Sequence, residues 1–140
     1  MVYTIKQAAE KISLSIYTLR YYDKEGLLPF IARDNAGNRF FTENDMEWLE
    51  VICCLKNTGM SIKQIKKYIQ LCFNGDETLE NRKQMLIEHR LEVVKQITGL
   101  KHNLEKINYK IDHYNTTCSV HVEDKNIYTA EFNLNVLPSI

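Results

Sequence analysis

The sequence predicts a mainly α protein, in which a small N-terminal domain of short helices is followed by one long helix. Helix breakers are rare, because only five glycines and two prolines occur in 140 residues. Turn signals punctuate the first forty residues, whereas residues 79–114 contain no proline and a single glycine. A chain of this length forms one modest globular domain, or a small domain with a helical appendage.

Two short helices open the chain. The first covers residues 5–11, has Thr4 as its N-cap and carries apolar residues on one face. After an interruption at residues 13–15, the second runs from about residue 15 to residue 25, and Gly26 ends it. Two short helices joined by a tight turn are typical of a helix-turn-helix. The second helix is expected to turn Ile16, Leu19 and Tyr22 inward and Tyr17, Thr18, Arg20 and Tyr21 outward.

A hairpin is predicted at about residues 30–41. An apolar approach at residues 27–29 leads into a turn rich in Asn and Gly, and the aromatic pair at residues 40–41 follows. Arg33 and Arg39 lie on its two limbs. The hairpin therefore forms a wing beside the second helix.

Two further helices follow the wing. Thr42 begins a helix that runs to about residue 57, and Asp45 occupies the helix-favouring position three residues later. Gly59 closes this helix, and Ser61 caps the next one, which ends at residues 74–76. The apolar stripe expected on the first of these helices consists of Met46, Leu49, Val51, Ile52 and Leu55.

Residues 79–114 are predicted to form one helix about 54 Å long, too long to be covered by a globule of 140 residues. From Leu100 onward its apolar residues are spaced by 4, 3, 4 and 3, which is a coiled-coil seam. We expect a homodimeric coil, parallel or antiparallel; the alternative is a helix folded back on its own domain. The residues expected at the dimer interface are Leu86, Leu91, Val94, Ile97, Leu100, Leu104, Ile107 and Ile111.

These elements predict three regions: a winged helix-turn-helix domain over residues 1–75, a coiled-coil helix over 79–114, and a C-terminal tail over 115–140. Apolar and polar residues alternate at 120–122 and 132–136, which indicates a small hairpin. A disordered or partner-ordered tail explains the same segment equally well.

Charge and cysteine usage exclude several classes of protein. The chain carries 18 basic and 18 acidic residues, which excludes a generically basic nucleic-acid coat and a polybasic membrane-binding protein. Residues 1–72 nevertheless hold ten basic and eight acidic residues, so the first half is slightly basic. There is no apolar run of membrane-spanning length, and the four cysteines show no CxxC spacing. We expect a soluble, cytoplasmic protein with reduced thiols and no cofactor.

Four segments of the sequence resemble the MerR family of transcription regulators. They are YTI at residues 3–5, TLRYYDKEGLL at 18–28, NRFF at 38–41 and GMSIKQI at 59–65. The second is highly specific, because it must form a helix, its cap and the turn into a wing together. The likeness covers residues 1 to about 72, and the long helix fits the dimerisation helix of that family.

The resemblance implies a homodimer on a pseudo-palindromic site in double-stranded promoter DNA. The dimer would bend and undertwist an overlong promoter spacer, and would act on RNA polymerase only indirectly. Ser15, Tyr17 and Thr18 would read bases, whereas Arg20 and Tyr21 would hold phosphates. The residues expected to contact DNA are Thr4, Ser15, Tyr17, Thr18, Arg20, Tyr21, Arg33, Asn38 and Arg39.

A narrower likeness to the AdhR/NmlR branch rests on CLKNTGM at 54–60, GDETLENR at 75–82 and NYKI at 108–111. Members of this branch resemble sensors of aldehydes and other electrophiles, acting in stress responses, and their proposed sensing thiol falls here on Cys54. Local charge does not select it: Lys56 favours a thiolate at Cys53, and Glu50 opposes one at Cys54. Cys53 and Cys118 are less favoured candidates, and Cys72 is expected to pack in its helix.

Other functions remain as alternatives. A metal-responsive regulator could use His113, Cys118 and His121, although metal-binding loops of the family usually offer two cysteines and this segment offers one. A regulator responsive to another small molecule would use the same C-terminal segment. A coiled-coil module without DNA binding would leave the wing arginines without a purpose. An enzyme is not expected, since no phosphate-binding loop or catalytic constellation is present.

Overall fold

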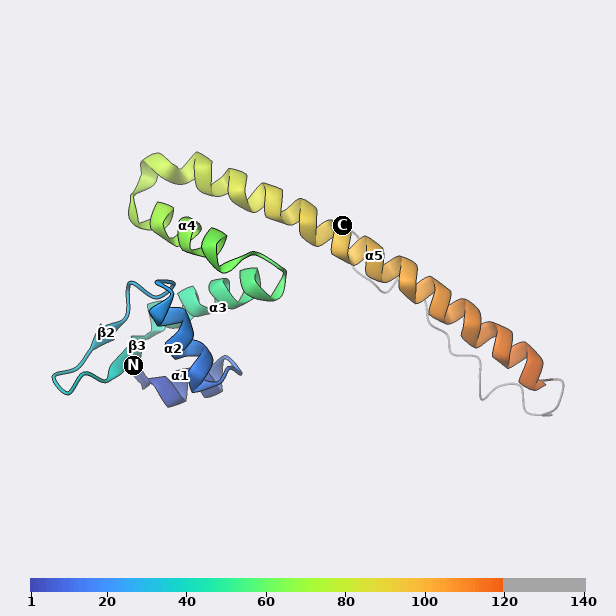
Figure 1. The fold of residues 1–140 in the computed structure, drawn as a ribbon, viewed down its shortest axis with the longest axis horizontal. Helices are drawn as coiled ribbons and strands as arrows, with labels where there is room; N and C mark the ends of the chain where they lie inside the picture. The colour runs from blue at the N-terminus through green and yellow to red at the C-terminus, as the bar shows by residue number, and fades with distance from the viewer. Residues whose placement is uncertain (120–140) are drawn as a thin grey trace. The chain divides into compact units, whose positions relative to one another are not determined.

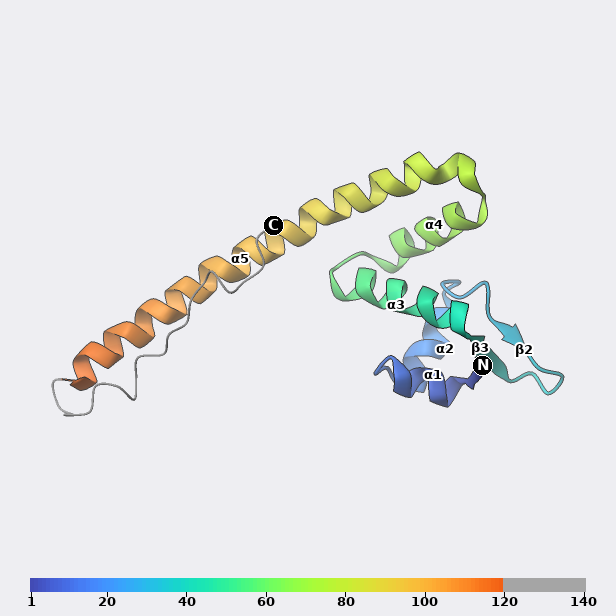
Figure 2. The same ribbon diagram turned by 180° about the vertical axis from the view of Figure 1, so that it is seen from behind.

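The computed structural model describes residues 1–119, and its helices follow the predicted order (Figures 1 and 2). The chain divides into two compact units, the first spanning Met1–His89 and the second beginning at Arg90. The mainly α fold predicted from the sequence is confirmed. The elements are β1 (Val2–Thr4), α1 (Ile5–Lys11), α2 (Ile16–Lys24), β2 (Ala32–Arg33), β3 (Arg39–Thr42), α3 (Glu43–Asn57), α4 (Ile62–Phe73), the 3-10 turn η1 (Asp76–Thr78) and α5 (Leu79–Ser119).

Side-chain caps fix the start of both helices of the helix-turn-helix. Thr4 accepts a hydrogen bond from the backbone N–H of Gln7 at 3.2 Å, and the Gln7 side chain accepts one from the Thr4 N–H at 2.9 Å. This reciprocal capping box begins α1 at the predicted residue. Ser15 accepts the backbone N–H of Thr18 at 3.1 Å and begins α2. Between the helices, Ser13 adopts a φ of 57°, which lets the chain reverse in a tight turn.

The wing belongs to a three-stranded antiparallel sheet in which β3 lies between β1 and β2. Val2 pairs with Thr42, and Arg33 pairs with Arg39. The predicted hairpin of β2 and β3 is therefore present, but β1 was not predicted. Three residues at the start of a chain carry too short a pattern to indicate a strand. Pairing with β1 attaches the base of the wing to the N-terminus of α1.

One hydrophobic core joins the elements of the first unit. Leu19 and Tyr22 are buried, as predicted for the inner face of α2. The prediction for Val51 was wrong: it is exposed, because it lies about 100° around α3 from the buried Ile52. The buried core residues are Ala8, Ala9, Leu19, Tyr22, Leu27, Leu28, Phe41, Met46, Leu49, Ile52, Leu55, Met60, Ile65 and Ile69.

A polar joint connects α4 to α5. The hydroxyl of Thr78 lies 2.5 Å from the carbonyl oxygen of Leu71 and 2.8 Å from that of Gly75. Arg82 on α5 donates from Nε to this hydroxyl at 3.1 Å and from Nη2 to the Gly75 carbonyl at 3.2 Å. The segment GDETLENR thus contains the residues that fix the first turn of α5 to the end of α4.

Helix α5 is 41 residues long, or about 60 Å, and extends five residues past the expected end at residue 114. Residues 115–119 contain no Pro or Gly that would end the helix. Within the helix, the hydroxyls of Thr116 and Thr117 donate to the carbonyls of Asp112 and His113. Helix α5 therefore passes the expected boundary at residue 114, and the predicted hairpin at residues 120–136 lies outside the described residues.

Apolar side chains along α5 are widely exposed. Leu100 is 68% exposed and Ile107 is 55% exposed. Among the other residues expected at a dimer interface, Leu86, Leu91 and Ile111 are exposed and Val94, Ile97 and Leu104 are partly exposed. In the described part of the second unit, the apolar seam is therefore accessible to a partner.

Candidate nucleic-acid interface

Helix α2 has a buried face and an exposed face that differ in chemistry. Leu19 and Tyr22 anchor it in the core, while Tyr17 is 81% exposed, Tyr21 is 47% exposed and Arg20 is also exposed. Of the four residues predicted to face outward, these three are exposed and Thr18 is partly buried. The three exposed residues present two phenol groups and one guanidinium on a helix whose orientation is fixed by its buried side.

The hydroxyl groups at the start of α2 serve the helix first. Ser15 Oγ accepts the Thr18 backbone N–H at 3.1 Å and lies 2.9 Å from the Thr18 hydroxyl. Thr4 caps α1 in a similar way. A hydroxyl retains a second lone pair after accepting one hydrogen bond, so these side chains can still contact a nucleic acid. Capping also fixes the positions of these hydroxyl groups.

Asp34 organises the turn of the wing. Its Oδ1 accepts the backbone N–H groups of Ala36 and Asn38, both at 2.9 Å. Gly37 adopts a φ of 82°, in the region that favours glycine. The amide of Asn38 lies 3.4 Å from Asp34 Oδ2 and its side chain is exposed. The turn that carries Asn38 is therefore held by its own side chains.

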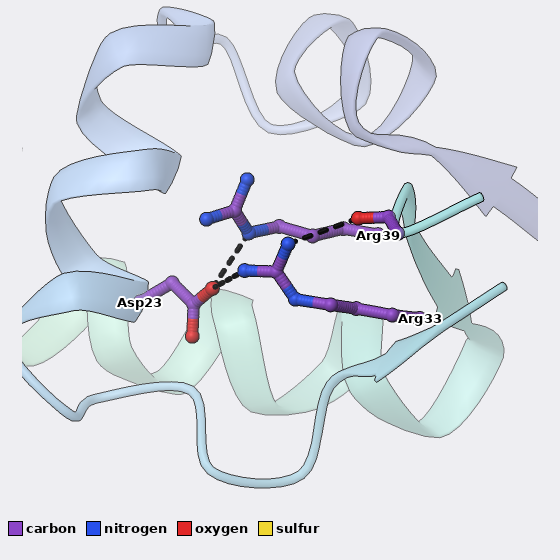
Figure 3. A network of polar contacts seen from close by, with 4 residues as sticks. Asp23, Arg33 and Arg39 are labelled. Atoms are coloured by element: carbon purple, nitrogen blue, oxygen red, sulfur yellow. Dashed lines mark hydrogen bonds and ion pairs between the residues drawn. The ribbon is translucent and has the colours of Figure 1, made fainter. Parts of the chain in front are cut away.

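Asp23 links the two arginines of the wing to α2 (Figure 3). Its Oδ2 lies 2.6 Å from Arg39 Nε and 3.4 Å from Arg33 Nη2. Arg33 also donates from Nη1 to the Gly37 carbonyl at 2.9 Å. Figure 3 shows the terminal nitrogens of Arg39 pointing away from the carboxylate. Asp23 thus orients both guanidinium groups and leaves donors available.

The role of Asp23 was not predicted, although it lies inside the segment TLRYYDKEGLL. The signal in the sequence was the presence of this acidic residue in a helix expected to approach phosphate groups. Asp23 and Arg39 are mostly covered, with side chains 22% and 20% exposed, whereas the Arg33 side chain is 51% exposed. The bond to Arg33 is therefore the weaker of the two, since an exposed ion pair contributes only about 0–1 kcal/mol to stability. Asp23 fixes the position of the wing against the second helix of the helix-turn-helix.

The neighbouring thiols of α3 differ in accessibility: Cys54 is exposed and Cys53 is half-buried. Burial raises the pKa of the Cys53 thiol, and the nearby Cys54 and Glu50 raise it further. The expectation that Lys56 would favour a thiolate at Cys53 was therefore wrong, because desolvation and the acidic neighbours outweigh one solvated lysine. Cys72 is half-buried in α4, as expected for a packing residue, and Cys118 is exposed.

The described residues offer little to a metal ion. Within residues 1–119, no three His, Cys, Asp or Glu side chains gather in a group that could hold one. Of the three residues considered as metal ligands, His113 packs against the ring of Tyr114 and His121 lies outside the described range. Over the same range, no helix has both the length and the hydrophobicity that a membrane crossing requires.

Two family models match the chain. "MerR HTH family regulatory protein" covers residues 3–72, and "MerR, DNA binding" covers residues 46–108. An uncharacterized HTH-type transcriptional regulator of Haemophilus influenzae is 49% identical over 114 residues, which are 81% of this chain and 84% of the relative. The regulator AdhR of Bacillus subtilis is 39% identical over 90 residues, 64% of each chain.

Solved structures give the same result. HiNmlR, described as a MerR family regulator lacking the sensor domain and bound to promoter DNA, superposes with a TM-score of 0.78 and 46% identity, covering 86% of this chain and 96% of the other. A MerR family regulator from Bacillus thuringiensis superposes with a TM-score of 0.75 and 43% identity, covering 81% of this chain and 100% of the other. The predicted likeness to the AdhR/NmlR branch agrees with these neighbours.

Proposed function

The chain belongs to the MerR family of helix-turn-helix regulatory proteins, and from that premise we propose that it acts as a homodimer that distorts promoter DNA in response to electrophiles. It is a DNA-binding transcription regulator and not an enzyme. The observation that carries the proposal is the exposed face of α2, with Tyr17, Arg20 and Tyr21, beside wing arginines that Asp23 orients.

The contacts to DNA divide between bases and phosphates. Side chains at the start of α2 read base edges in the major groove, where hydrogen-bond donors and acceptors distinguish all four base pairs. The cations and Tyr21 hold phosphates, which positions the protein but carries no sequence information. The proposed base-reading residues are Ser15, Tyr17 and Thr18, and the proposed backbone contacts are Thr4, Arg20, Tyr21, Arg33, Asn38 and Arg39.

DNA binding is tested on duplexes selected from a random pool by the protein itself. We expect the binding constant to fall with salt, because each phosphate contact releases counterions. Arg20→Ala is expected to lower affinity about tenfold for all duplexes and to reduce the salt slope by about one. Lys95→Ala is the matched control, since Lys95 pairs with Glu92 on α5. An affinity indifferent to salt, or unchanged by Arg20→Ala, contradicts the assignment.

Dimerisation through α5 sets the distance between two reading heads. The accessible apolar seam from Ile97 to Ile111 supports a coil with a second copy. Two heads on a two-fold site can grip phosphates on either side while the central base pairs are bent and undertwisted. Such a distortion would align the two polymerase-recognition elements of an overlong spacer, so polymerase is affected through the DNA. Energy transfer between dyes at the ends of the selected duplex measures the bend; an unbent duplex contradicts this step.

Cys54 is the proposed sensing residue. It is exposed, whereas the neighbouring Cys53 is half-buried with a raised pKa, and both differences favour reaction at Cys54. With an α,β-unsaturated aldehyde, the Cys54 thiolate adds to the β-carbon and forms a carbon–sulfur bond. The electron pair moves to the carbonyl oxygen, and the proton that the thiol released ends on the α-carbon. The product is a thioether that retains the aldehyde.

Acrolein is the probe for this step. Peptide mass spectrometry after limited treatment is expected to find the first adduct on Cys54. Cys54→Ser should bind DNA like the unchanged protein and lose the acrolein-dependent change in transcription from a promoter that carries the selected site. Cys53→Ser is the matched control and should keep the response. A response retained in Cys54→Ser contradicts the sensing role.

A further inference from the structure

The end of α3 closes on the carbonyl group of Cys54. This carbonyl is one of the last four of the helix, which have no continuing turn to bond them. Thr58, the residue that follows the helix, supplies two donors: its backbone N–H at 3.1 Å and its hydroxyl at 2.7 Å from the Cys54 oxygen. The position of the Cys54 backbone is therefore tied to Thr58.

The same hydroxyl contacts α5. His89 Nε2 lies 2.7 Å from Thr58 Oγ1, in a partly buried position. A hydroxyl has one proton, so if Thr58 donates to the Cys54 carbonyl, His89 must donate from Nε2 to Thr58. We assign the Nε2–H form to the ring on this ground, because the Thr58 hydroxyl lies 2.7 Å from the Cys54 carbonyl oxygen and 3.2 Å from that of Leu55 and so has carbonyl acceptors for its proton. The result is a chain from His89 N–H through Thr58 O–H to the Cys54 carbonyl. Each group in the chain is used once as a donor.

His89 and Arg82 are seven residues apart, two helical turns, so they face the same side of α5. Arg82 ties that face to the joint after α4, through Thr78 and Gly75. His89 ties it to the end of α3. The first three turns of α5 are thus held to the joint after α4 by Arg82 and to the residue that ends α3 by His89.

We infer that His89, acting through Thr58, is a positioning residue that couples modification of Cys54 to helix α5. The inference rests on the proposed sensing role of Cys54 and names the route by which it reaches the dimerisation helix. The last turn of a helix is its least protected part, so a new substituent on Cys54 displaces this turn more readily than the core of α3. Such a displacement moves the Cys54 carbonyl and Thr58, and so lengthens or breaks the bond to His89.

Hydrogen exchange on the full-length protein tests the coupling without any promoter. The probe is N-ethylmaleimide, which alkylates thiols, with the modified cysteines identified by peptide mass spectrometry. In the unchanged protein, alkylation of Cys54 is expected to speed exchange in residues 79–89 about three- to tenfold, the effect of losing about one net hydrogen bond. Thr58→Val and His89→Leu should exchange faster before treatment and should show no further change on alkylation.

Conservative variants distinguish the coupling between Cys54 and α5 from a general loss of stability. Thr58→Ser keeps the hydroxyl and His89→Gln keeps an N–H donor, so both should retain the alkylation-dependent change. Circular dichroism verifies that each variant is folded. Where Thr58→Val fails to fold, His89→Leu and His89→Gln decide the matter, because His89 is only partly buried and does not belong to the hydrophobic core.

Three results overturn the coupling. The first is an unchanged exchange rate in residues 79–89 after complete alkylation of Cys54. The second is a full alkylation-dependent change in Thr58→Val or His89→Leu. If Cys54→Ser shows no such change in the same experiment, the sensing role of Cys54 stands and only the coupling through Thr58 and His89 is removed. The third is a change retained in Cys54→Ser, which removes Cys54 as the origin and overturns the proposed sensing role together with the coupling.

Discussion

The apolar residues of the first compact unit lie in an environment opposite to that of the apolar residues described in the second. In the first unit, residues from five helices and strands meet in one core, where Leu19, Leu49 and Phe41 are completely buried. In the described part of the second unit, a single helix carries Leu100 and Ile107 with more than half of their surface exposed. Both regions carry apolar side chains on their helices, but only the first covers them within its own fold.

This contrast shows what each region needs in order to be stable. A domain that buries its own core is held by the hydrophobic effect within one chain. An isolated amphipathic helix gains nothing comparable until a second surface covers its seam. The first unit is therefore expected to fold at any protein concentration, whereas the part of α5 after His89 is expected to be stabilised by association.

Leu49→Ala is expected to lower the free energy of unfolding by about 3 kcal/mol, because it leaves a cavity in the closed core of the first unit. The fluorescence of Trp48, the single tryptophan of the chain, reports this unit in a urea titration. Leu100→Ala is the matched change in the exposed seam and should alter the same transition by less than about 0.5 kcal/mol. Equal effects at the two positions would erase the distinction between the units.

Leu100→Glu is expected to weaken the proposed dimer about a hundredfold or more, because each copy brings an unpaired carboxylate into the seam. Sedimentation equilibrium over a range of protein concentrations measures the change. Tyr109→Glu is the control, since Tyr109 is 71% exposed and lies off the 4, 3, 4, 3 spacing of the seam. A variant that remains as dimeric as the control would show that Leu100 is not at an interface.

Asp23→Asn tests whether Asp23 orients the two wing arginines on the polar surface of the first unit. Removing one negative charge between Arg33 and Arg39 leaves both guanidinium groups more available to phosphate. We expect affinity for unrelated duplexes to rise about two- to threefold with a steeper salt dependence, and the preference for the selected site to fall. Fluorescence anisotropy with both duplexes measures this, and Asp112→Asn on α5 is the control for net charge. An unchanged ratio of the two affinities argues against an orienting role of Asp23.

The sequence predicted those features that depend on local pattern. The caps at Thr4, Ser15, Thr42 and Ser61 begin helices at the predicted residues because an N-cap is decided within three residues. The pairing of β1 with β3 and the ion pair between Asp23 and Arg39 were not predicted, because each joins residues that are not neighbours in the sequence. The exposure of Val51 escaped it because neighbouring apolar residues on a helix cannot all face one core.

For the candidate sensing site too, some features could be predicted from the sequence and others depend on packing. The choice of Cys54 as the candidate sensing thiol followed from a resemblance, whereas its exposure relative to Cys53 depends on how α3 packs. The bond between Thr58 and His89 spans 31 residues of sequence, and no periodic pattern indicates it. Pattern therefore identified the helices and the candidate residues, and packing decides which of them can react and what they contact.

The smallest expected effect concerns Cys53 and Cys54, where the contrast between buried and exposed recurs within two residues. A raised pKa leaves Cys53 with less thiolate at any pH below that pKa, so iodoacetamide should alkylate it slowly near pH 7 and faster only above the ordinary thiol range of about 8.5. Cys54 should therefore react ahead of Cys53 at neutral pH, and the difference between their alkylation rates should narrow as the pH rises.

Because ionised Cys54 and Glu50 also raise the pKa of Cys53, Cys54→Ser and Glu50→Gln should each shift the alkylation profile of Cys53 to lower pH. Burial should still keep that profile above the profile of a free thiol. Rates from peptide mass spectrometry at several pH values measure the shift, and a Cys53 profile that matches free cysteine would mean that α3 does not shield this thiol.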